Sequence, residues 1–393
     1  MAGTPGTPRV LRAMNDRAAL ELLVAHGPLT RTRLGELTGL SKPTAAQLLT
    51  RLEAAGLVRR TGSVTGRPGP SAGLYEVDPG IAHVAALSVG PEGVTARVAD
   101  IAGTVAGEHH AAADRGAGAA ELVARAVDGA LAAAGLGRDA LHRTVIGTPG
   151  ALDPRTGLLR YAPHLPDWRS PALLDELAGI TGTPVVLEND VNLAAVAEQH
   201  ASAARGFADY VLLWADEGVG AAVVLGGTLL RGATGGAGEI GYMPLPGAPL
   251  ARGGDDATAG PDGGGGFQML VASPAVVALA RTHGIDARTA PEALARAAAE
   301  PGAGDDVYAE LGRRLALGLA AVVAVVDPEL VVLSGAVCRA GGERLRAMVE
   351  AELTGLALPR PQLRLSAVED RPVLAGALQT ALAAVRETVF DTA

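Results

Sequence analysis

A run of β-branched residues leads directly into a polar triplet near the middle of the chain, and a helical pattern follows it. This stretch, Val185 to Glu198, has the sequence VVLENDVNLAAVAE. A strand that carries polar residues at its carboxyl end is the arrangement in which open α/β sheets bind ligands. Two functions remain open for Asp190, a general base for a hydroxyl or a hydrogen-bonding anchor, and Asn189-Asp190 also suits capping of the following helix.

Length and composition limit the class of protein. The 393 residues exceed one ordinary core, so two or three domains are expected, and 48% hydrophobic with 19% charged residues indicates a globular chain. The single cysteine, Cys338, excludes internal disulfides and any cysteine-cluster metal site. The N-terminal segment is polar and the longest apolar run, Leu315 to Val326, is too short to span a bilayer, so we expect a cytoplasmic protein without a membrane partner.

Charge is distributed unevenly along the chain. Residues 1–79 contain ten Lys and Arg against six Asp and Glu, a net charge of +4, and the remainder contains 23 against 36, a net charge of −13. A basic head on an acidic body predicts that a nucleic-acid partner would meet the head.

Three helices are expected in this head. Asn15 to His26 has apolar side chains at helical spacing until Gly27-Pro28 ends the pattern. Thr30 can cap a second short helix that Gly39 closes, and Ser41 can cap a third. The third helix has a polar face opposite an inward stripe formed by Ala45, Leu48, Leu49 and Leu52. Two short helices joined by a tight glycine-containing turn predict a helix-turn-helix.

A wing is expected after the third helix. Gly56 to Arg60 begins a strand, Thr61 to Gly73 forms a Gly/Pro-rich tip, and Leu74 to Val77 returns. The alternative is a small helical interaction module with a solvated polar face, but helix order, capping, wing and charge together favour DNA binding. Polar side chains of the third helix suit base edges, and the arginines suit phosphates or the minor groove. The predicted DNA-binding residues are Ser41, Lys42, Thr44, Gln47, Arg51, Arg59, Arg60 and Arg67.

The body alternates hairpins with α/β units. Strands are expected at 81–89, 94–101, 143–147, 210–214, 220–225 and 329–333, and helices at 121–134, at 170–181, within 268–326 and at 372–388. Two successive hairpin-then-α/β units predict a duplicated α/β body with a cleft between its halves.

The body resembles the ROK family of repressors, open reading frames and sugar kinases, whose fold is the two-lobed actin-like ATPase type. The matching stretches, in the family's order, are IGTPGALDPRTG at 146–157, LPDW at 165–168, LENDVNLAAVAE at 187–198, GATGGAGEIGYM at 232–243 and DPELVVLSGAV at 327–337. The resemblance runs nearly end to end and includes the winged helix of the repressor members. It implies an α/β chain with a winged helix-turn-helix domain at 1–79 and a two-lobed sugar-kinase-like domain for effector binding and dimerisation at 80–393.

The resemblance also implies roles for single residues. In the sugar kinases of this family, the aspartate that matches Asp190 deprotonates the sugar hydroxyl, and the residues that match Asn189 and Glu239 bind other hydroxyls. Tyr242 and Gln268 stand here in place of a histidine and a glutamate of the family. The implied effector-binding residues are Gly150, Asn189, Asp190, Glu239, Tyr242 and Gln268.

Both phosphate-binding turns depart from the family's pattern. The first, Asp-x-Gly-Gly-Thr in the kinases, reads Ser88-Val89-Gly90-Pro91-Glu92, and the second, Gly-Thr-Gly-x-Gly, reads Asp216-Glu217-Gly218-Val219-Gly220. The three carboxylates thus introduced would repel triphosphate oxygens by about 1 to 4 kcal/mol each. We therefore expect poor ATP binding and no catalytic residue, with Asp190 a degenerate base position.

The metal site of the family is expected to be lost as well. Its structural zinc uses a histidine after the Ala-Gly-Glu-x-Gly stretch and three cysteines. Tyr242 replaces the histidine, and residues 251–266 contain no cysteine. Because zinc takes about four nitrogen or sulfur ligands, we expect no zinc, no other metal and no cofactor.

These observations predict a DNA-binding transcriptional regulator, a repressor and not an enzyme, whose body senses a sugar or sugar-phosphate effector. A homodimer or higher homo-oligomer would place two heads on a palindromic double-stranded operator. An ATP-dependent sugar kinase with a fused DNA-binding domain is the main alternative. A constitutive DNA binder without a ligand is a third possibility.

Overall fold

The computed structural model describes residues 8–64, 72–114, 118–160, 162, 165, 168, 170, 172–201, 203–250 and 265–391. The head contains α1 (Pro8–His26), β1 (Leu29–Thr30), α2 (Arg31–Thr38), α3 (Lys42–Ala54), β2 (Val58–Val64) and β3 (Ala72–Val77). The predicted caps are present, since Thr30 accepts a hydrogen bond from Arg33 N, Ser41 accepts one from Thr44 N, and Gly39 closes α2 in the left-handed conformation. The predicted inward stripe of α3 is buried.

Boundaries in the head differ from those predicted. Helix α1 begins at Pro8 instead of Asn15. Val10, Leu11 and Met14 in its first two turns are exposed, so these turns lack the buried apolar stripe from which the helix was predicted. Strand β2 continues to Val64 and β3 begins at Ala72, so part of the predicted hairpin tip is strand. Strand β3 pairs antiparallel with both β1 and β2. The winged helix-turn-helix is therefore confirmed, with longer wing strands.

The first lobe of the body is a five-stranded sheet in the order β10-β7-β4-β5-β6. Its strands are β4 (His83–Gly90), β5 (Gly93–Asp100), β6 (Val105–Ala112), β7 (Leu141–Thr148) and β10 (Val185–Asn189). Helix α4 (Ala119–Ala134) packs on β5 and β6, and α12 (Pro372–Asp391) packs on β4 and β7. Val84 and Ala86 belong to the core with α12, whereas Ala85 and Leu87 belong to the core with α4, so the two helices cover opposite faces. Helix α5 (Leu173–Thr181) and the hairpin of β8 (Ala151–Asp153) and β9 (Leu158–Arg160) complete this lobe.

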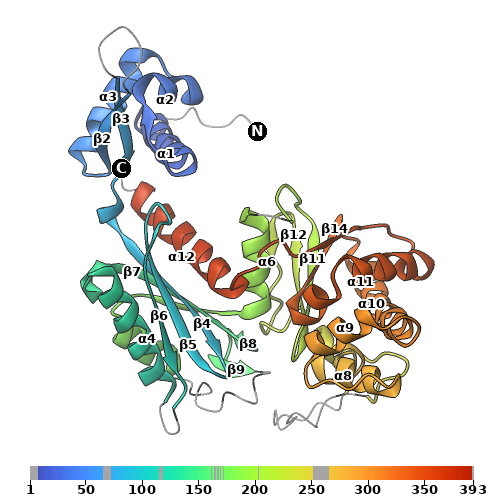
Figure 1. Cartoon of the computed structure of the whole chain (residues 1–393). Helices are drawn as coiled ribbons and strands as arrows, with labels where there is room; N and C mark the ends of the chain where they lie inside the picture. Colours follow the sequence, from blue (N-terminus) through green and yellow to red (C-terminus); the bar gives the residue numbers. More distant parts are fainter. Residues whose placement is uncertain are drawn as a thin grey trace.

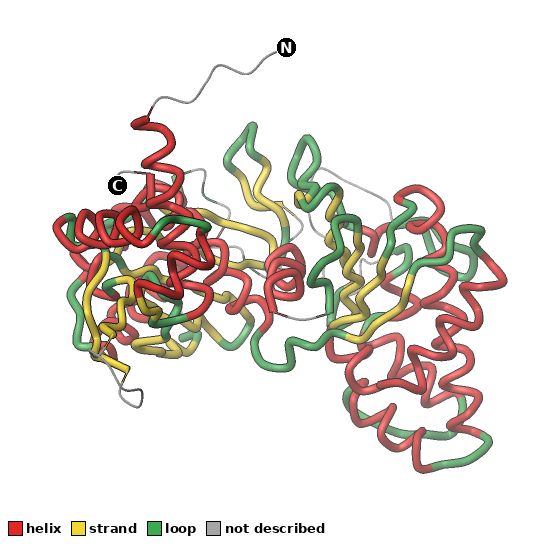
Figure 2. The backbone as a smooth tube through the Cα atoms, turned by 90° about the horizontal axis from the view of Figure 1, so that it is seen from above, coloured by secondary structure: helices red, strands yellow, loops and turns green. Residues whose placement is uncertain are grey.

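The second lobe is a five-stranded sheet in the order β13-β12-β11-β14-β15. Its strands are β11 (Tyr210–Ala215), β12 (Val219–Leu225), β13 (Thr228–Leu229), β14 (Leu330–Ser334) and β15 (Gln362–Leu365). Its helices are α7 (Gln268–Val271), α8 (Ser273–Thr282), α9 (Ala290–Ala299), α10 (Ala303–Val326) and α11 (Gly335–Leu356). Helix α6 (Asp190–Ala201) leads from the first lobe to the second, and Figures 1 and 2 show the two sheets side by side.

The predicted duplication of the body is confirmed by the strand pairing. In each lobe the first strand pairs antiparallel with the second and parallel with the fourth, the second pairs antiparallel with the third, and the fourth pairs parallel with the fifth. The two lobes therefore share one topology.

Some elements of the body differ from those predicted. Strand β6, strand β15 and helix α11 were not predicted. Helix α5 begins at Leu173 instead of Ser170, and Ile81 lies in a 3₁₀ turn (η1, Pro79–Ile81) instead of a strand.

Helix α12 closes the first lobe. By length and composition alone it is apolar enough to cross a membrane. Its apolar residues pack instead against α6, β4 and β7, and Leu374, Leu382 and Phe390 are buried, which is the packing of a core helix. In Figure 1 its last turn lies next to the head.

Candidate functional site

The polar triplet lies where β10 ends and α6 begins. Strand β10 runs parallel to β7 in the sheet of the first lobe, and its last residue is Asn189. The Asn189 Oδ1 accepts a hydrogen bond from Asn192 N at 3.1 Å, which caps α6, and its Nδ2 donates to Gly150 O at 2.9 Å. Asn189 thus has the capping role that the sequence left open, and its second amide N–H makes no hydrogen bond to another residue in the described part of the chain.

Asp190 and Glu239 bring two carboxyl groups together between the lobes. Burial raises the pKa of Asp190 to about 6, and the charge of Asp216 adds to this rise. Burial also raises the pKa of Glu239 to about 7, with Asp190 as the second cause. Asp190 Oδ1 accepts a hydrogen bond from Val191 N at 2.8 Å. Because each group can be protonated or charged near neutral pH, the pair can donate to and accept from ligand hydroxyls.

Close backbone packing places Glu239 opposite Asp190. Gly238 has a φ of +94°, and a Cβ added to it would lie 1.9 Å from Ala221 O of β12, so only glycine fits there. A Cβ on Gly220 would lie 3.2 Å from Val191 Cγ2 and 4.0 Å from Gly238 O. The start of α6 therefore meets the segment that carries Glu239.

Gly150 is joined to Asn189 through its carbonyl, whereas Tyr242 and Gln268 lie together in the second lobe, where a Cβ on Gly241 would lie 3.6 Å from Gln268 Cβ. Gly150 has a φ of +82°, and a Cβ there would lie 2.2 Å from Arg160 O, so its glycine is explained by the β8–β9 hairpin. Half-buried Tyr242 lies in a 3₁₀ turn (η4, Ile240–Tyr242). Gln268 Nε2 donates to Gly265 O at 3.4 Å, so the described contacts join Gln268 to the wall of the second lobe and not to Asp190.

Glu188 and Arg231 belong to the same region but were not singled out from the sequence. Glu188, 8% exposed, accepts hydrogen bonds from Asn192 Nδ2 at 2.9 Å and from Arg231 Nε at 2.7 Å. Because Glu188 is the penultimate residue of β10 and Arg231 follows β13, this ion pair links the two lobes beside the candidate site. The position of Glu188 in the polar triplet was the signal that could have identified it.

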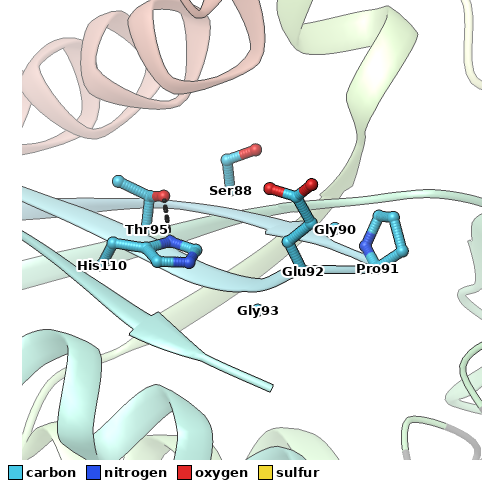
Figure 3. A pocket seen from close by; sticks show the side chains of 7 residues that line it. All are labelled: Ser88, Gly90, Pro91, Glu92, Gly93, Thr95 and His110. Carbon is cyan, nitrogen blue, oxygen red and sulfur yellow. Dashed lines mark hydrogen bonds between the residues drawn. The ribbon is translucent and has the colours of Figure 1, made fainter.

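The first altered phosphate turn lines a cavity of about 260 Å³ (Figure 3). Its wall is formed by Ser88, Gly90, Pro91, Glu92, Gly93, Thr95 and His110. Thr95 Oγ1 and His110 Nδ1 share a hydrogen bond of 3.0 Å. These lining residues include a carboxylate and a proline without an N–H, and no Lys or Arg, so they do not suit a phosphate group.

The second altered turn places a carboxylate at the start of α11. Asp216 Oδ2 accepts a hydrogen bond from Ala336 N at 2.9 Å, and its Oδ1 accepts one from Glu217 N at 3.0 Å. Glu217 itself is exposed. One of the first-turn N–H groups of α11 that an anionic ligand could use is therefore bonded to a carboxylate of the chain itself.

The candidate DNA-binding residues divide into two groups. Lys42 and Gln47 are exposed on α3, and their side chains make no hydrogen bond or ion pair to another described residue. The other described candidates have partners within the head. The Ser41 and Thr44 hydroxyls share a hydrogen bond of 2.8 Å, and Arg51 Nη2 lies 2.6 Å from Asp16 Oδ1. Arg59 Nη2 lies 2.8 Å from Glu76 Oε1, and Arg60 lies over the Tyr75 ring. Arg67 lies outside the described residues.

Comparison with known proteins agrees with the two-part architecture. The sequence profile of the ROK family matches residues 84–384, and that of the MarR family matches residues 14–67. Over 108 residues the chain is 40% identical to a glucokinase of Thermotoga maritima, a match that covers 27% of this chain and 34% of that protein. It is 24% identical over 243 residues to a putative xylose repressor of Caldicellulosiruptor sp., covering 61% of each. The matches thus cover less than two thirds of both relatives.

One solved structure matches the whole arrangement. It is a ROK family transcriptional regulator, a homologue of the Escherichia coli Mlc protein, with a TM-score of 0.72 and 20% identity. The match covers 98% of this chain and all of the other, so it extends over the winged helix and both lobes. At this identity the likeness establishes the fold.

Proposed function

Because this chain belongs to the ROK family and carries a MarR-like winged helix ahead of the family's body, we propose that it is a DNA-binding transcriptional regulator, a repressor whose body binds a sugar or sugar-derived effector without phosphorylating it. The observation that carries this proposal is the combination of a winged helix with carboxylates in both phosphate turns. The protein acts in the cytoplasm as a homodimer or higher homo-oligomer on a palindromic operator.

Loss of kinase activity is supported by the surroundings of Asp216. A triphosphate would have to displace its carboxylate from Ala336 N and would then lie beside a like charge. Each such contact disfavours the nucleotide by about 1 to 4 kcal/mol at effective dielectrics between water and the protein surface. Asp190, Asn189 and Glu239 are left with the task of holding hydroxyl groups.

A sugar kinase fused to a DNA-binding domain is the second candidate, favoured by the retained Asp190 and by the glucokinase match. We expect no sugar-dependent release of ADP from ATP, in an assay where a ROK glucokinase serves as the positive control. Turnover that the Asp190→Asn substitution abolishes would establish the kinase instead.

The DNA-binding face is tested by comparing Gln47 with Lys42, both exposed on α3. Operators would first be selected from random DNA. Gln47→Ala is expected to lose about 1–3 kcal/mol of discrimination at one base pair, because a Gln amide reads a base edge. Lys42→Ala should weaken binding to all sequences and lower the salt slope of log K by about 1, because it removes a phosphate contact. Unchanged gel-shift titrations for both variants would show that α3 is not the DNA-binding helix.

A further inference from the structure

The head and the first lobe share one hydrophobic core. This core contains Leu20 and Leu23 of α1, Val84 of β4, and Val385 and Phe390 of α12. Each of these side chains is less than 5% exposed. Helix α12 thus joins the two parts, because its last turn lies next to the head and the helix packs on β4 and β7 of the first lobe and on α6.

The covalent connection between the two parts is also packed. Strand β3 ends at Val77 and β4 begins at His83, with the turn η1 between them. Asp78 caps this turn by accepting a hydrogen bond from Gly80 N at 2.9 Å, and Ala82 is 1% exposed. The connection is a short structured turn, unlike a flexible linker.

A second attachment joins α1 to the end of α12. Arg17 Nη1 lies 2.8 Å from Asp391 Oδ1, and Phe390, the preceding residue, is 2% exposed. One turn earlier, Arg386 Nε donates to Ile101 O at 2.9 Å and holds α12 to the first lobe. Because the ion pair is exposed and Phe390 is buried, Phe390 is the stronger anchor.

We infer that the end of α12 fixes the orientation of the DNA-binding head relative to the first lobe, with Phe390 and Asp391 as positioning residues. Two separated attachments, η1 and the last turn of α12, prevent the head from swivelling about its covalent connection. In a dimer, the distance between the two α3 helices is then set by the bodies. The consequence for the spacing of DNA half-sites rests on the proposed function, whereas the inference that α12 fixes the orientation of the head does not.

Hydrogen exchange of the full-length protein tests the attachment without DNA. Phe390→Ala is compared with Leu374→Ala, a matched truncation of a buried residue in the first turn of α12. We expect Phe390→Ala to speed exchange in α1 and α3 at least tenfold over Leu374→Ala, which should act on β4 and β7. Equal exchange of the head in both variants would overturn the inference. If Phe390→Ala does not fold, Asp391→Asn, which removes an exposed charge, is used in its place. Hydrogen exchange in α1 that is at least twofold faster than in the wild type supports the inference, and unchanged exchange overturns it.

DNA spacing provides the second measurement. On selected operators, the wild type should lose at least tenfold in affinity when the half-site spacing changes by a few base pairs, and Phe390→Ala should reduce this loss to threefold or less. Its affinity for the original spacing and its salt slope should change little, which a general loss of folding would not produce. A Phe390→Ala variant with wild-type spacing preference contradicts the inference. A wild type that binds no DNA refutes the proposed function and leaves the exchange result to decide.

Discussion

Replacing Asp190 with asparagine is expected to stabilise the protein above pH 7 and to abolish effector binding. In the folded chain, burial raises the pKa of Asp190 from 3.8 to about 6. The folded state therefore holds this proton to higher pH than the unfolded chain does, and stability falls as pH rises from about 4 to about 6. Asparagine carries no charge to desolvate and can still accept from Val191 N. Since one pKa unit corresponds to about 1.4 kcal/mol and the residue is half-buried, we expect a gain of roughly 2 kcal/mol at pH 8.

Thermal unfolding between pH 4 and 8 measures this effect. The difference in Tm between Asp190→Asn and the wild type should grow up to about pH 6 and then level off. Glu239→Gln should show the same pattern up to about pH 7, where the raised pKa of Glu239 lies. Glu387→Gln, which removes an exposed charge from α12, is the control. Equal or lower stability of Asp190→Asn at pH 8 would show that the folded protein stabilises the charged carboxylate.

Effector binding is measured with the same Asp190→Asn protein. Calorimetry against a panel of sugars and sugar phosphates first identifies a compound that binds the wild type. We expect its affinity for Asp190→Asn to fall beyond detection, because the substitution removes the charge-assisted hydrogen bonds that the proposed anchor would make to a ligand hydroxyl. Retained affinity would exclude Asp190 as an anchor.

Replacing Arg51 with alanine is expected to weaken DNA binding and to destabilise the head. Arg51 Nη2 lies 2.6 Å from Asp16 Oδ1, and the Asp16 side chain is only 7% exposed. Without Arg51 this buried carboxylate loses its charged partner, which costs about 1–3 kcal/mol. If Arg51 also contacts phosphate, the salt slope of log K falls by about 1. Denaturant unfolding and gel shifts at several salt concentrations measure the two effects separately.

A double variant separates the two roles of Arg51. Asp16→Ala combined with Arg51→Ala removes both charges, so it should recover most of the lost stability but not the lost DNA affinity. Full recovery of DNA binding would mean that Arg51 acts on the fold of the head alone.

Local features of the head could be predicted from the sequence, whereas its long-range pairs could not. The Thr30 and Ser41 caps and the glycine after α2 depend on neighbouring residues, so composition and spacing identify them. Arg51 and Asp16 are 35 residues apart, and only the packing of α3 on α1 brings them together. The sequence therefore identified Arg51 as a free cation for DNA, but the structure gives it a partner.

In the body, too, local patterns could be predicted from the sequence and contacts between distant residues could not. Strand β6 was missed because most of its residues are exposed, which leaves no regular alternation of apolar and polar side chains. Helix α11 was missed where Gly342 interrupts it with a φ of +57°. Carboxylates in the second phosphate turn could be counted from the sequence, but the bond between Asp216 and Ala336 joins residues 120 apart. The sequence thus identified the polar groups of the phosphate turns, but only the fold shows which of them are already hydrogen-bonded within the protein.

The position of α12 has a consequence for biosynthesis. Strand β4 leaves the ribosome before nearly all of the body, yet its core is completed only by a helix near the other end of the chain. N-terminal parts of a protein generally fold first during translation, at about 5–20 residues per second. Here the head and the first lobe must wait for α12, and Phe390 is among the last residues added to their shared core. Nascent or truncated chains that lack α12 therefore lack the helix that joins the core of the head to that of the first lobe.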